Sequence, residues 1–123
     1  MHSFALLVLL TGTSALDVGA DNNKARIIDS DSDRTPLHTV VPVYPFKARR
    51  DRIEGEVQVC FDIDRAGRTR RVAVRRSTHR IFERPSIRAV KASTFRPLDD
   101  DQALQAIKSC RTFVFALQPV EDG

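Results

Sequence analysis

Residues 56–64 read Glu-Val-Gln-Val-Cys-Phe-Asp-Ile-Asp. Every second residue is large and apolar, and the residues between them are polar or, at Cys60, small. This period of two places Val57, Val59, Phe61 and Ile63 on one face, as in a strand that is buried on one side only. The turn-forming sequence Asp-Arg-Ala-Gly follows at residues 64–67, and Gly67 can adopt a positive φ. Residues 70–76 then alternate again. Together the two segments predict a β-hairpin.

The rest of the chain predicts helices and one further strand. Pro85 suits a first helical turn, and the apolar spacing from Ile87 to Val90 predicts a main helix that ends before Pro97. Shorter helices are expected at residues 46–52 and 99–108. Residues 111–117 alternate around Phe113 and Phe115 and predict a third strand.

The lengths of these elements predict an α+β fold. A helix that follows the hairpin returns the chain to the end where the second strand began. If the third strand pairs with the first, every neighbouring pair is antiparallel. We therefore expect a three-stranded antiparallel sheet, in the order second, first, third, with the helix packed on one face.

The chain ends differ from this domain in composition. Residues 1–20 contain an apolar run, Phe4 to Leu10, followed by small residues, as in a secretory signal peptide cleaved after Ala15 or Ala20. The run is too short for a retained transmembrane helix, which needs roughly 20 apolar residues. Residues 21–39 are polar and predict a flexible leader. The expected domain spans residues 40–119, and residues 120–123 form a tail.

Cys60 and Cys110 are the only cysteines, and export to an oxidising compartment would favour a disulfide between them. The alternation places both on the sheet face opposite the helix, on strands that are adjacent in the predicted order. A bridge is therefore permitted. Two separate, half-buried thiols are the alternative, because the sequence leaves the register of the two strands open.

The net charge of +4 reflects basic clusters at residues 47–52 and 65–76. No aromatic side chains interleave with these arginines, so we expect a solvated basic face, or attraction to anionic envelope surfaces, and no nucleic-acid partner. His38, Ser77 and His79 belong to no recognisable catalytic motif, and the histidines are far apart in the sequence. We expect no enzymatic activity, no cofactor and no metal site.

A set of short motifs, read in order, resembles the TonB C-terminal domain family. They cover residues 42–97 and extend on the strand pattern to 117. In this sequence they are Tyr44-Pro45, Ala48, Ile53-Glu54-Gly55, Val57, Val59, Phe61, Ile63, Gly67, Val72, Val74, Ser77, Phe82, Ala89-Val90 and Phe95-Arg96-Pro97.

The resemblance implies a periplasmic binding domain. It would capture an extended segment, the TonB box of an outer-membrane receptor, by adding it as a strand to the sheet edge in support of transmembrane transport. The third strand is the expected edge. The implied contacts are the backbone of Arg111, Thr112, Phe113, Val114, Phe115 and Ala116, and the extended stretch Val41, Pro42, Val43 and Tyr44.

Two features narrow what the resemblance implies. Val41 and Val43 stand where family members with a known receptor contact carry polar residues. The resemblance therefore does not extend to that polar contact. The chain also shows neither the retained membrane helix nor the long proline-rich reach of an energising TonB, so energy transduction is not expected from it. The alternative is a stand-alone adaptor or structural module that binds envelope polymer, or forms a homodimer through its edge strand.

Overall fold

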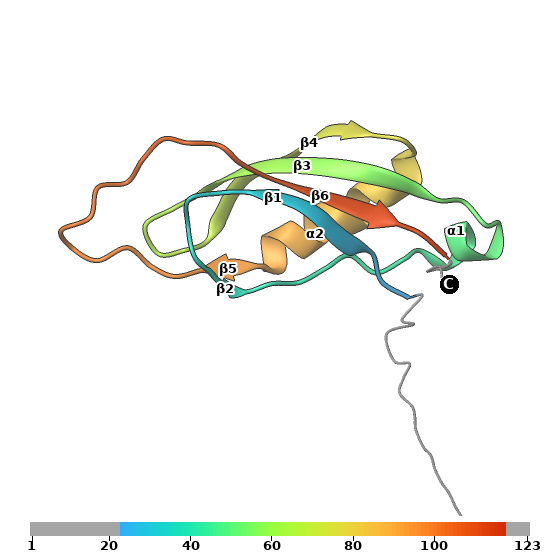
Figure 1. Cartoon of the computed structure of the whole chain (residues 1–123), viewed down its shortest axis with the longest axis horizontal. Helices are drawn as coiled ribbons and strands as arrows, with labels where there is room; N and C mark the ends of the chain where they lie inside the picture. The colour runs from blue at the N-terminus through green and yellow to red at the C-terminus, as the bar shows by residue number, and fades with distance from the viewer. Residues whose placement is uncertain (1–22, 118–123) are drawn as a thin grey trace, which may run out of the picture.

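A computed structural model describes residues 23–117 of the 123-residue chain (Figure 1). The expected signal peptide and C-terminal tail lie outside the described residues. The elements are β1 (Arg26–Asp31), β2 (Pro36–His38), α1 (Phe46–Arg50), β3 (Gly55–Ile63), β4 (Thr69–Ser77), the 3-10 helix η2 (Arg80–Phe82), α2 (Glu83–Ala92), β5 (Thr94–Phe95) and β6 (Ser109–Phe115).

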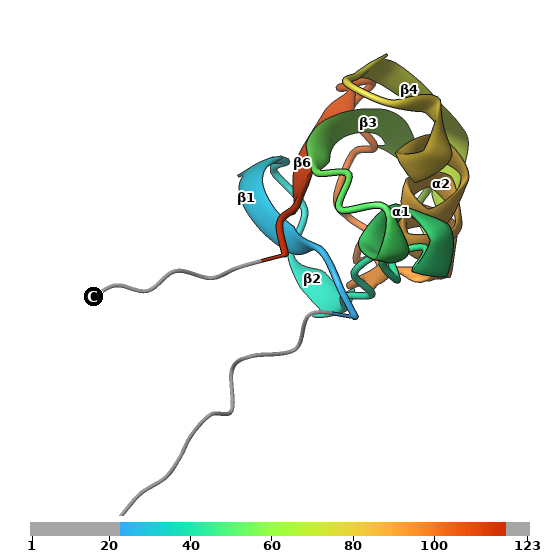
Figure 2. The ribbon, with the colours of Figure 1, turned by 90° about the vertical axis from the view of Figure 1, so that its right-hand side faces the viewer.

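The main sheet has the strand order β1-β6-β3-β4, and every neighbouring pair is antiparallel. β4, β3 and β6 are the predicted second, first and third strands, so their order is confirmed. α2 follows β4 in the chain and packs against β4 and β3 on one face of the sheet, as expected. The sheet has four strands rather than three, because β1 pairs with β6 at the end opposite β4 (Figure 2).

The β3–β4 hairpin closes on Gly67, whose φ is +90°. The Gly67 amide donates to the Asp64 carbonyl at 3.0 Å, and the Phe95 amide donates to the Gly67 carbonyl at 2.8 Å. A Cβ atom at position 67 would lie 1.9 Å from the Phe95 carbonyl oxygen. Glycine is therefore required twice here, for the turn conformation and for the close approach of β5.

The core lies between the sheet and the layer formed by α2 and the chain around Tyr44. Phe82 stacks on Phe115 with ring centroids 4.2 Å apart, and Tyr44 meets both rings edge-on at 5.7 and 5.5 Å. The Tyr44 hydroxyl donates to the Ile53 carbonyl at 2.5 Å, so the polar end of a buried ring has a partner. Phe95 is buried against Phe61, as a plug beneath the sheet.

Residues 24–38 carry regular structure, which the expectation of a flexible leader did not include. Lys24 pairs with Val43, residues 26–31 form β1, and residues 36–38 form β2, which pairs with β5. Ala25 is buried and donates its amide to the Pro42 carbonyl at 2.9 Å. The packed region therefore begins well before residue 40, because backbone pairing with β6 and β5 orders a segment with few apolar side chains.

The helix expected at residues 99–108 is absent, and a turn followed by irregular chain stands in its place. Residues 99–108 are all exposed, so this segment has no buried apolar face to stabilise a helix. Arg65, in the β3–β4 turn, instead donates to the carbonyls of Gln102 and Asp99 at 2.8 and 3.0 Å. These bonds hold the loop beside the hairpin.

Candidate partner-binding edge

β6 carries most of the predicted partner-binding residues but is not an edge of the sheet. One side of β6 pairs with β3, and the other pairs with β1 through Arg26↔Val114, Ile27↔Phe113 and Asp29↔Thr112. The expectation that the third strand is an open edge is therefore wrong for this conformation. The chain's own residues 26–31 occupy the backbone groups that a partner strand would use.

β1 contributes little buried surface to the sheet. Five of its six residues are exposed, and only Ile27 is partly buried against the core. The register also shifts between Ile27 and Asp29. Beyond the strand, the Ser109 hydroxyl donates to the Ser32 hydroxyl at 2.9 Å. Backbone hydrogen bonds, the contact of one isoleucine and this hydroxyl pair hold β1 in place.

The core-facing side chains of β6 anchor it firmly. Phe113 and Phe115 are completely buried. Arg111 shares their face, is only 2% exposed, and places its guanidinium carbon 5.0 Å from the centre of the Phe95 ring. Burial lowers the pKa of Arg111, because the charged form loses hydration. The cation–π contact offsets part of that loss.

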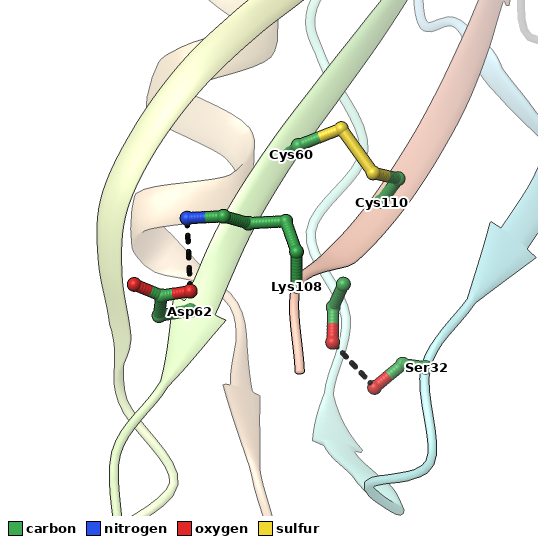
Figure 3. Close-up of a disulfide and its surroundings, with 6 residues drawn as sticks. Ser32, Cys60, Asp62, Lys108 and Cys110 are labelled. Carbon is green, nitrogen blue, oxygen red and sulfur yellow. Dashed lines mark hydrogen bonds and ion pairs between the residues drawn. A yellow bond between two sulfur atoms is a disulfide. The ribbon is translucent and has the colours of Figure 1, made fainter. Parts of the chain in front are cut away.

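The opposite face of β6 carries the disulfide. Cys60 and Cys110 face each other across β3 and β6 and are bonded (Figure 3). The sequence left this pairing open, and the register decides it. Beside the bridge, Lys108 Nζ lies 2.9 Å from Asp62 Oδ1 and Arg71 lies 3.2 Å from Asp62 Oδ2. The hydrogen bond from Lys108, supported by Arg71, lowers the pKa of Asp62.

Residues 41–44 meet the β6 segment at Tyr44, which contacts Phe115. Pro42 and Tyr44 are buried and support the domain, whereas Val43 is 62% exposed and Val41 is half-buried. The structure therefore brings the two predicted partner-binding segments together at one point. Only Val41 and Val43 of the first segment present side chains to solvent.

The remaining candidate residues each have surroundings of their own and form no shared site in the described part of the chain. His38 is exposed on β2, Ser77 donates its hydroxyl to Glu83 Oε2, and the His79 ring packs edge-on against Phe82. Among residues 23–117, no group of three His, Cys, Asp or Glu side chains is placed to hold a metal. In the same residues, no helix has both the length and the apolar character needed to span a membrane.

Comparison with known protein families identifies a family that matches the folded region. The family described as Gram-negative bacterial TonB protein C-terminal matches residues 40–117. The chain belongs to the TonB C-terminal domain family.

A relative and a solved structure from this family are similar to the chain. The protein TonB of Pseudomonas aeruginosa is 33% identical over 90 residues, which is 72% of this chain and 26% of that protein. The solution NMR structure of the Pseudomonas aeruginosa TonB C-terminal domain is 31% identical, with a TM-score of 0.59, and the match covers 74% of this chain and 93% of that one. The chain thus spans about a quarter of the length of the TonB relative.

Sequence reasoning missed two features of the site. The first is β1, whose only signal is the Ile27-Ile28 pair within a polar stretch. The second is the burial of Arg111, which the alternation of residues 111–117 implies once Phe113 and Phe115 face the core. Arg111 lies on β6, the strand that the resemblance marks as the partner-binding strand, and β1 pairs with that strand.

Proposed function

We propose that the protein is a periplasmic binding domain that captures an extended segment of an outer-membrane receptor, the TonB box, by strand addition in support of transmembrane transport. Membership of the TonB C-terminal domain family supports this role. The observation that carries it is the pairing of β6 with a weakly packed strand of the same chain. Binding, not catalysis, is the proposed activity, and export to the periplasm is part of the proposal.

Strand capture at β6 requires β1 to leave. An entering segment would form backbone hydrogen bonds in place of those lost from β1, so the exchange would cost mainly the contact of Ile27 and the Ser32–Ser109 hydrogen bond. A partly buried isoleucine contributes on the order of 1 kcal/mol. Because the exchanged backbone hydrogen bonds cancel, side-chain contacts of the receptor segment supply the free energy that displaces β1 and offsets the entropy lost on association.

β6 itself is held so that it stays in place while β1 is exchanged for the partner segment. Its core face is held by Phe113 and Phe115, and its outer face is tied to β3 by the Cys60–Cys110 bond. The partner would therefore bind a strand with fixed register. Val41 and Val43, which flank the buried Pro42, lie on the segment that the family resemblance also assigns to receptor contact.

Locking β1 onto β6 tests the proposal. Arg26 and Val114 are register partners, so Arg26→Cys with Val114→Cys would bond the two strands. We expect the purified protein to retain receptors from detergent-solubilised outer membranes, the oxidised double variant to lose them, and mild reduction to restore them. Disulfide mapping would show that Cys60–Cys110 remains intact, and native protein under the same reductant is the control. Equal receptor recovery with β1 locked would contradict capture at β6.

A further inference from the structure

A groove of about 470 Å³ lies between α2 and the extended chain that leads to α1. Figure 1 shows this chain on the same side of the sheet as α2. Most of the lining is apolar, and only two of its residues are charged. The lining residues are Val40, Val41, Pro42 and Val43 on one wall, and Pro85, Arg88, Ala89, Lys91 and Ala92 on the other.

The cations at this groove belong to a stripe along α2. Arg84, Arg88 and Lys91 are exposed, and their spacing of four and three residues places them on one side of the helix. Among the described residues none of the three forms an ion pair, whereas Arg70, Arg71 and Arg76 of β4 each pair with a carboxylate. The stripe is therefore an uncompensated positive charge beside an apolar groove.

The position of Arg84 argues against a purely stabilising role for the stripe. Arg84 lies in the first turn of α2, where the partial positive charge of the helix N-terminus disfavours a cation. Lys91 lies in the last turn and interacts favourably with the helix, but Arg84 does not. Glu83 lies in the same turn, but its carboxylate accepts the Ser77 hydroxyl and forms no ion pair with Arg84, so an anionic partner along the stripe would offset the repulsion at Arg84.

The other wall offers a backbone edge. Lys24 and Val43 form an antiparallel bridge, but its hydrogen bonds come from the neighbouring residues. The Ala25 amide donates to the Pro42 carbonyl, and the Tyr44 amide donates to the Asn23 carbonyl. In an antiparallel pair this pattern turns the amide and carbonyl of Val43 away from Lys24. Val43 can therefore pair with one further extended segment, and its exposed side chain extends the apolar wall.

We propose that this groove binds a short, extended, acidic peptide segment of a partner protein. An apolar side chain of the segment packs on Val41 and Ala92, and neighbouring carboxylates pair with Arg88 and Lys91. Charge complementarity identifies the segment as acidic. The free backbone groups of Val43 favour a peptide over a lipid surface, since acyl chains would leave them without hydrogen bonds. The groove shares Val41 and Val43 with the segment that the family resemblance assigns to receptor contact, but its lining includes no residue of β6, and the segment that it binds is a second one beyond the segment captured at β6.

Fluorescence anisotropy with short synthetic peptides tests this proposal. One peptide alternates valine with aspartate and glutamate, and its control replaces the acids with lysine. We expect only the acidic peptide to bind, with an affinity that falls as salt increases. Arg88→Glu with Lys91→Glu should weaken binding by about tenfold or more, because two charge pairs become repulsive. Arg68→Glu with Arg75→Glu makes the same change of net charge on exposed residues outside the groove and should leave binding unchanged.

Three results would overturn the proposal. If both double variants lose affinity for the acidic peptide equally, the peptide is attracted by the net charge of the protein and not by this groove. If the acidic peptide does not bind the native protein, acidic peptides are not the ligand of this groove. Binding of phosphatidylglycerol vesicles that depends on Arg88 and Lys91, without peptide binding, would assign the groove to a lipid surface. The β1-locked variant should still bind the acidic peptide, which separates this site from capture at β6.

Discussion

Cys60 on β3 and Cys110 on β6 are register partners whose Cα atoms lie 4.0 Å apart, and a disulfide joins them. This bond ties the central strand to the strand that we propose binds the partner. The two cysteines are 50 residues apart in the chain, so the bond closes a long loop and restricts the unfolded state.

Removal of this bond should lower the free energy of unfolding by about 2 to 4 kcal/mol. Chemical denaturation of Cys60→Ala with Cys110→Ala, beside the native protein with and without reductant, measures the effect. Reductant should destabilise the native protein to the level of the double variant and leave the variant unchanged. A native protein that is insensitive to reductant while its thiols are shown to be reduced would contradict the prediction.

Gly67→Ala should lower the free energy of unfolding by about 1 to 3 kcal/mol, because alanine is strained at a φ of +90°. The added methyl group would also push against the Phe95 carbonyl, so β5 must move. Thermal unfolding measures the change. Ala66→Ser is the control, since position 66 is exposed in the same turn and should tolerate the change.

The neighbouring residues Ile27 and Ile28 should differ in their effect on β1. Ile27 packs against the core and Ile28 is 51% exposed, so Ile27→Ser should loosen β1 and Ile28→Ser should not. Amide hydrogen exchange at Thr112 and Val114 would report this opening, with faster exchange only in Ile27→Ser. Matching exchange rates in the two variants would show that β1 is held by backbone pairing alone.

The same pair of variants tests self-association. An opened β6 edge can pair with a second copy of the chain, as exposed edge strands do. We therefore expect a monomer for the native protein and for Ile28→Ser, and a concentration-dependent dimer for Ile27→Ser. Sedimentation velocity over a range of concentrations measures this. A monomer at every concentration for Ile27→Ser would argue against a homodimer through β6.

Asp62 should make the stability pH-dependent. The hydrogen bond from Lys108 and the charge of Arg71 hold the pKa of Asp62 below its unfolded value. Its contribution is therefore present above the unfolded pKa and is lost as the pH falls through the folded pKa. Asp62→Asn should be less stable than the native protein at neutral pH and equal to it in acid. Asp101→Asn, in the exposed loop, should show no such difference.

The strands β3, β4 and β6 and the helix α2 were predictable because each carries its own periodicity. Val57, Val59 and Phe61 mark a buried face without reference to the rest of the chain. Residues 26–31 have no such pattern, and their strand exists only because β6 offers backbone partners. The acidic start of residues 99–108 and the lysine at their end suggested a short helix, but Leu104 and Ile107 remain about half exposed and stabilise no helix.

Local chemistry in the sequence determined the hairpin, its glycine turn, the antiparallel order of three strands and the resemblance to the TonB C-terminal domain family. Only the tertiary structure decided three features of the binding surface. These are the register that joins Cys60 to Cys110, the occupation of β6 by β1, and the groove between Val43 and α2. Each of them depends on contacts between segments far apart in the chain, and a one-dimensional pattern carries no information on how such segments align.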